Sequence, residues 1–171
     1  SIIAQPHWRS LVQKSLESDD NLEFWDATQA AKVLGIDTWD IQWRRLQSTP
    51  TESGRWYEVM ARCNDERIDM IMVFAETHLP LEKVATGPGD ELGLGPEYEI
   101  HGCLAFILQE LGKYPGKGAA IVEAALQSPV ISNRHWAVNV LSSWGKPAWP
   151  SSVQPALEKA VAREPEKEVR E

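Results

Sequence analysis

The sequence predicts an all-α fold of stacked helical hairpins, and three observations support this prediction. Apolar residues recur at helical spacing through most of the chain, and these patterns start and stop at recognised helix signals. A polar-then-apolar pattern recurs at intervals of 32, 36 and 33 residues. No period-2 strand is evident, because the one candidate, residues 69–74, lies between helix-capping signals. With 171 residues, the chain is expected to form a single domain over 1–171.

The N-terminal part, residues 6–80, predicts helices of irregular spacing. The helix over 21–35 ends at Gly35, and the next follows Asp37, a suitable N-cap. Two more patterns follow, and Pro80 stops the last of them. The residues on the predicted apolar stripes are Phe24, Ala27, Ala31, Leu34, Trp39, Trp43, Leu46, Trp56, Val59, Met60, Cys63, Ile68, Ile71, Met72 and Ala75.

The C-terminal part predicts four helices, after a loop over residues 81–95. The first has Pro96 in its first turn and closes on Gly112. Three shorter apolar patterns follow, over residues 118–126, 133–145 and 151–162. The apolar stripes of the first, third and fourth of these helices consist of Ile100, Cys103, Leu104, Ile107, Leu108, Leu111, Trp136, Ala137, Val140, Leu141, Trp144, Val153, Leu157, Ala160 and Val161.

The recurring pattern consists of an apolar anchor with a polar residue three positions before it. Between the last three anchors lies a second short helix each time, which defines helical hairpins with a length in the mid-thirties. We therefore expect two stacked hairpins over residues 97–163. The anchors are Ile68, Ile100, Trp136 and Val169, and the polar residues before them are Asp65, Glu97, Asn133 and Glu166.

The stretch SPVISNRHWAVNVLSSWGKPAWPSSVQPALEKAVAREPEKEVRE resembles a HEAT repeat followed by the opening of the next. EPEKEVRE matches that opening, with Val169 and Arg170 as the apolar–arginine pair, whereas Ala137 stands where an arginine is usual. The resemblance is good over 96–171 and loose over 21–80. It implies a short right-handed α-solenoid of the HEAT/armadillo type. Such solenoids mostly bind macromolecules on a concave face.

The segment ELGLGPEY…H is also similar to one in bacterial HEAT-like proteins of unassigned function, some of which carry a hydroxylase label. No haem-ligand motif, dinucleotide fingerprint or metal triad in the sequence supports that label. We therefore expect no cofactor and no catalytic residue. The expected function is a non-enzymatic scaffold that binds a protein partner, and the alternative is a HEAT-like DNA glycosylase.

The stretch GPGDELGLGPEYEIHG, residues 87–102, is the most unusual in the chain. It lacks the preceding strand and the spacing of a dinucleotide-binding loop. Glu97 and His101 share a helix face. Three interpretations of this pair remain: a metal site, the acidic start of a capped helix, and a contact with a partner. We expect an ordered acidic loop over 81–99, in which Leu92 and Leu94 pack inward. The predicted partner-binding residues are Asp90, Glu91, Glu97, Tyr98, His101 and Trp149.

Charge and composition limit the class of partner. The net charge is −8, which opposes nucleic-acid binding. No apolar run reaches the ~20 residues that span a membrane. Cys63 and Cys103 lie within apolar helical patterns without a CxxC motif, which favours free thiols and a cytoplasmic location. Of the eight tryptophans, Trp8 and Trp25 fit the apolar stripes less well than those assigned to the core.

Overall fold

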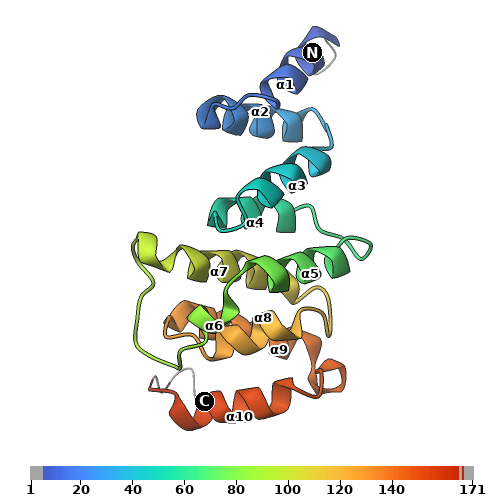
Figure 1. The fold of residues 1–171 in the computed structure, drawn as a ribbon. Coiled ribbons are helices and arrows are strands. Elements are labelled where there is room, and N and C mark those ends of the chain that lie inside the picture. The colour runs from blue at the N-terminus through green and yellow to red at the C-terminus, as the bar shows by residue number, and fades with distance from the viewer. Residues whose placement is uncertain (1–5, 166, 168–171) are drawn as a thin grey trace. The chain divides into compact units, whose positions relative to one another are not determined.

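The computed structural model describes residues 6–165 and 167, and most of these are helical (Figure 1). Within these residues there is no strand, only one isolated β-bridge between Glu91 and Val130. The all-α prediction is therefore confirmed. None of the helices in this part of the chain is long and apolar enough to cross a bilayer. The sequence assignments that involve Glu166, Val169 and Arg170 lie outside the described residues.

The chain divides into two compact units, Ser1–Ser48 and Thr49–Glu171. Each unit has helices that pack on one another. The expectation of a single domain over residues 1–171 stays a prediction.

The first unit contains a helical pair followed by a third helix. Its core joins α1 to α2 through buried side chains that include Leu16, Phe24 and Ala31. The α2 helix starts where expected, because the Asp20 carboxylate accepts the Glu23 N–H at 2.8 Å. Asp37 accepts the Trp39 N–H at 2.9 Å, but α3 begins at Trp39, so Asp37 lies one position before the N-cap position predicted for it. The three helices are α1 (Pro6–Ser15), α2 (Asn21–Val33) and α3 (Trp39–Ser48).

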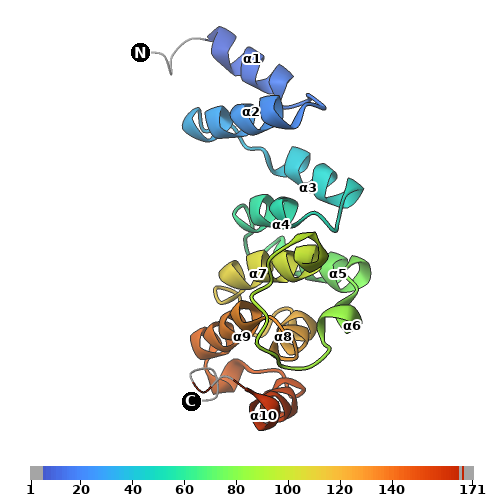
Figure 2. The ribbon, with the colours of Figure 1, turned by 90° about the vertical axis from the view of Figure 1, so that its left-hand side faces the viewer.

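The second unit is built of helices in successive layers, as Figures 1 and 2 show. Helix α4 packs on α7, α7 packs on α9, and α8 packs on both α9 and α10. The helices are α4 (Ser53–Met60), α5 (Ile68–His78), α6 (Leu81–Val84), η2 (Pro96–Tyr98), α7 (Glu99–Leu111), α8 (Ala119–Leu126), α9 (Ile131–Trp144), η3 (Lys146–Ala148) and α10 (Val153–Arg163).

The four helices expected over residues 97–163 are present as α7, α8, α9 and α10. Pro96 starts a 3-10 turn rather than the first α-helical turn, and α7 begins at Glu99. Proline is suited to this position because it has no N–H to leave unpaired at a helix start. The strand alternative for residues 69–74 is wrong, since these residues lie in α5.

The tryptophans on the predicted stripes form much of the core. Trp39, Trp56 and Trp144 are buried, whereas Trp43 and Trp136 are half-buried. The Trp144 indole donates to the Leu111 carbonyl oxygen at 3.0 Å, which joins the end of α9 to the end of α7. The core prediction therefore holds for three of the five and in part for the other two.

Candidate functional site

The loop predicted over residues 81–95 is shorter than expected, because Leu81–Val84 form α6 and the loop covers residues 85–95. It is attached to the turn between α8 and α9 through its backbone. The Gly87 N–H donates to Gln127 O at 2.7 Å, and the Glu91 N–H donates to Pro129 O at 3.1 Å. The Glu91 carbonyl oxygen accepts the Ile131 N–H at 3.0 Å. Figure 2 shows the loop running along α8 and α9 before it returns to α7. The long loop is thus held by its backbone at two residues, Gly87 and Glu91.

Two glycines allow this close attachment. Gly93 has a φ of +73°, and a Cβ there would lie 2.8 Å from the Val130 Cγ1 atom. Gly87 has a φ of +117°, and a Cβ there would lie 2.9 Å from the Arg163 guanidinium. A residue with a side chain would be strained at either of these dihedral angles, and at Gly93 its Cβ would also collide with Val130. The guanidinium beside Gly87 is the end of a flexible side chain, so the positive φ is the main constraint there. These glycines therefore allow the backbone of the loop to lie close against its neighbours.

The prediction that Leu92 and Leu94 pack inward is wrong. Their side chains are 72% and 74% exposed. The physical reason is that backbone hydrogen bonds to residues 127–131 hold the loop, so no apolar side chain has to anchor it. Asp90, Glu91 and Glu97 are exposed, as expected. The loop consequently displays two leucines among carboxylates, and residues 90–98 are called the acidic–leucine loop below.

Polar contacts join this loop to the start of α7. The Tyr98 hydroxyl donates to the Glu91 carboxylate, and this hydrogen bond raises the pKa of Tyr98. The Tyr98 and His101 rings lie 5.5 Å apart, tilted by 54°. His101 Nδ1 lies 3.0 Å from Ser128 Oγ, in the turn that holds the loop. Four residues from two segments of the chain thus form one cluster.

The histidine–serine pair in this cluster is structural rather than nucleophilic. Ser128 is fully buried, and its hydroxyl oxygen already accepts the Val130 N–H at 3.1 Å. The same hydroxyl lies 3.0 Å from His101 Nδ1, so both of its hydrogen-bond neighbours are groups of the protein. A serine without access to solvent cannot attack a substrate.

Burial lowers the pKa of His101, and the nearby Glu91 carboxylate opposes that shift only in part. The folded protein thus binds a proton at His101 less readily than the unfolded chain does. This contribution to stability is present above the unfolded pKa of about 6.5 and decreases as the pH falls below it. We expect an NMR titration to give a His101 midpoint below 6.5.

The same shift predicts a difference between wild type and His101→Asn in chemical denaturation. The difference in free energy of unfolding should decrease as the pH is lowered from about 7.5 to about 5.5, because only the wild type has this imidazole to protonate. A difference that stays constant with pH, or a midpoint at or above 6.5, would contradict the assignment.

The carboxylate side chains of this region do not form a cluster. Glu99 turns toward α4, where its carboxylate accepts the Ser53 N–H at 2.7 Å. Glu91 is engaged by Tyr98, while Asp90 and Glu97 are exposed. Throughout the described ranges, no three His, Cys, Asp or Glu side chains are grouped so as to hold a metal ion. The carboxylates of this region are therefore distributed over its surface rather than gathered around a centre.

Trp149 was predicted as a further contact residue, but it lies apart from the acidic–leucine loop. It is half-buried, and its indole donates to Leu141 O at 2.8 Å. It follows η3, in the connection between α9 and α10, and Figure 1 places that connection on the other side of the unit from the loop. The hydrogen bond holds the Trp149 indole against the last turn of α9.

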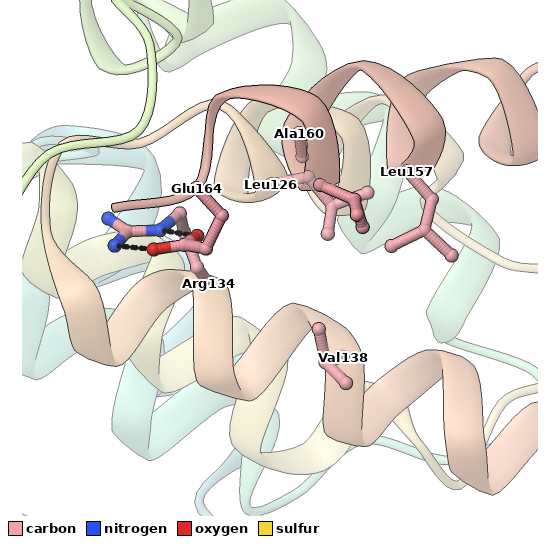
Figure 3. Close-up of a pocket in the computed structure, with 7 residues that line it drawn as sticks. Leu126, Arg134, Val138, Leu157, Ala160 and Glu164 are labelled. Carbon is pink, nitrogen blue, oxygen red and sulfur yellow. Dashed lines mark hydrogen bonds and ion pairs between the residues drawn. The ribbon is translucent and has the colours of Figure 1, made fainter. Parts of the chain in front are cut away.

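A small cavity lies between α8, α9 and α10, and Figure 3 shows the residues that line it. The Arg134 guanidinium forms two bonds to the Glu164 carboxylate, at 2.6 and 2.7 Å. It also donates to the carbonyl oxygens of Ser128 and Pro129, at 2.9 and 3.1 Å. Four of the five guanidinium N–H groups therefore bind the protein itself, which makes this ion pair a structural link.

Arg134 and Glu164 were not identified from the sequence. They are separated by 30 positions, and an arginine and a glutamate in a charged region have the pattern of solvated residues. Ser128 was missed for a similar reason, since only the packing of the loop shows that it supports His101.

Comparisons with known proteins do not add an assignment: no protein-family model, no curated protein and no solved structure matches this chain. The resemblance to HEAT repeats consequently stays a prediction.

Proposed function

We propose that this chain is a non-enzymatic interaction scaffold that binds a protein partner through its acidic–leucine loop. The observation that carries the proposal is the exposure of Leu92 and Leu94 on a loop whose backbone is fixed by hydrogen bonds. Exposed leucines on an ordered segment gain about 1.5–3 kcal/mol each when a partner buries them. Since the backbone is already held in place, little conformational entropy opposes that gain.

The proposed architecture is a short right-handed α-solenoid of the HEAT type. The packing of α7 on α9 and of α8 on α10 supports it, because stacked helical hairpins place equivalent helices against each other. The proposed location is the cytoplasm, in keeping with free Cys63 and Cys103.

The partner is expected to be a protein surface with an apolar depression and basic groups around it. The leucines supply the apolar contact, and the carboxylates of Asp90 and Glu97 supply charge at its edge. Charges at the edge of an interface mainly change the association rate, whereas the apolar centre mainly determines the dissociation rate.

We expect Leu92→Ser/Leu94→Ser to abolish capture of the partner without changing stability. Both side chains are exposed, so the free energy of unfolding should change by no more than about 0.5 kcal/mol. The measurement is quantitative affinity capture from cell extract by the full chain and by this variant. Val73→Ser, which alters another exposed apolar residue of the same unit, is the matched control.

With the captured protein in hand, Asp90→Lys should slow association several-fold at low salt and leave dissociation nearly unchanged. Asp90 is preferred over Glu91 for this test, because Glu91 also holds the Tyr98 hydroxyl. The proposal fails if the leucine variant retains the same proteins as Val73→Ser. Steeply salt-dependent retention of duplex DNA by the wild type would instead support the glycosylase alternative.

A further inference from the structure

The first unit has an open groove between α1 and α2 that the proposed function does not use. Trp8, Leu11, Val12 and Ser15 line it from α1, at the spacing of residues that share one helix face. On the α2 side it is lined by Leu22, Ala27 and Ala30, together with acidic residues. The groove thus runs between two roughly continuous helical ridges.

The groove is apolar, and its walls are accessible. Val12 and Ala27 are buried, whereas Trp8, Leu11 and Leu22 are 43%, 51% and 70% exposed. Burial of exposed leucine and tryptophan side chains is the main favourable term in association. The small side chains of Ala27 and Ala30 leave room for a helix to approach closely. The shape therefore suits an amphipathic helix laid along the groove.

The charged residues that line the groove are all acidic. Among the described residues that line it, Asp20, Glu23 and Asp26 are acidic and none is basic. Glu23 is held in place by the Ser15 and Ser18 hydroxyls, at 2.8 and 2.7 Å. These hydrogen bonds, first from Ser18 and then from Ser15, lower the pKa of Glu23, so it is ionised at neutral pH. An occupant with basic residues beside its apolar face is complementary to this edge.

We infer that the groove between α1 and α2 binds an amphipathic helix of a protein partner that carries lysine or arginine beside its apolar face. The inference is independent of the proposed function, because it rests on other residues in the other unit. A second copy of this chain fits less well, since two-fold self-pairing would place the carboxylates of the two grooves against each other. An anionic lipid surface would be repelled by the same carboxylates.

The test uses the full chain and a designed peptide of about 18 residues, long enough to form a helix on binding. The peptide has leucine and phenylalanine at helical spacing and lysines beside them. A second peptide has the same apolar residues with glutamate in place of lysine. Isothermal titration calorimetry should show the lysine peptide binding at least about tenfold more tightly, with a difference that shrinks in high salt.

Variants of the protein locate the binding site. Leu11→Ser and Leu22→Ser should each weaken the lysine peptide about tenfold, as expected for central apolar contacts. Asp26→Lys should reduce the difference in affinity between the lysine peptide and the glutamate peptide. Val33→Ser alters an exposed valine of α2 outside the groove. It should change neither the affinity for the lysine peptide nor the preference between the two peptides. Both leucines are exposed, and circular dichroism verifies that each variant is folded.

Several results would overturn the inference. They are the absence of measurable binding by the lysine peptide, equal affinity for the two peptides, and an effect of Val33→Ser as large as that of Leu11→Ser. Tighter binding to vesicles of anionic lipid than to the lysine peptide would reassign the groove to a membrane surface. A dimer in light scattering that Leu11→Ser dissociates would reassign it to self-association.

Discussion

Replacement of Arg134 by methionine is expected to lower the free energy of unfolding by about 3–5 kcal/mol. The Arg134 and Glu164 side chains are 1% and 3% exposed, so the substitution removes a buried guanidinium that pairs with a buried carboxylate. It also removes the donors that satisfy the carbonyl oxygens of Ser128 and Pro129. These carbonyls belong to the turn that holds the acidic–leucine loop. The measurement is urea denaturation of the wild type and the variant.

A second variant and a surface pair make the test specific. Arg134→Met/Glu164→Leu should recover much of the lost stability, because two apolar side chains can replace a buried ion pair. Arg44 and Glu17 form an ion pair 3.5 Å apart with both side chains 64% exposed. Arg44→Met should therefore cost about 1 kcal/mol or less. Equal losses for Arg134→Met and Arg44→Met would show that the buried pair does not link α10 to α9.

Trp144→Ala is expected to cost about 3–5 kcal/mol, as for other buried aromatic residues. The side chain is buried at the end of α9, and its indole donates to Leu111 O, a carbonyl at the end of α7. The alanine variant loses the packing of the ring and leaves this carbonyl without a donor. Thermal or urea denaturation measures the change.

Two controls separate the contributions to this loss. Trp144→Phe keeps an aromatic ring but removes the donor, so it should cost less than the alanine variant, about 1–3 kcal/mol. Trp25→Ala, at an exposed tryptophan of α2, should cost about 1 kcal/mol or less. A Trp144→Ala variant that unfolds like the wild type would contradict both the buried position and the alignment of helices that predicted it.

The helices were largely predictable from the sequence because their signals are local. Apolar residues at helical spacing, such as Phe24, Ala27 and Ala31, identify the buried face of α2 without knowledge of its neighbours. The end of α7 beside Gly112 and a contact of Asp37 with the start of α3 were likewise expected. Each of these features depends on residues a few positions apart in the chain.

The candidate site was only partly predictable. An acidic exposed surface around Asp90, Glu91 and Glu97 was expected and is present. The outward orientation of Leu92 and Leu94 was not expected, because apolar side chains in a loop usually anchor the loop to the core. The loop is instead anchored by the backbone, and backbone hydrogen bonds leave no residue-specific pattern in the sequence.

The sequence by itself thus determined that this protein is all-α and where most of its helices begin and end, since periodicity and capping act within one or two turns. Only the tertiary structure decided that residues 85–95 lie against 127–131, that Arg134 meets Glu164 and that two leucines face solvent. The physical reason is that these contacts join segments about 30 to 40 residues apart. Their stability depends on how the helices pack together, and no short stretch of sequence contains that information.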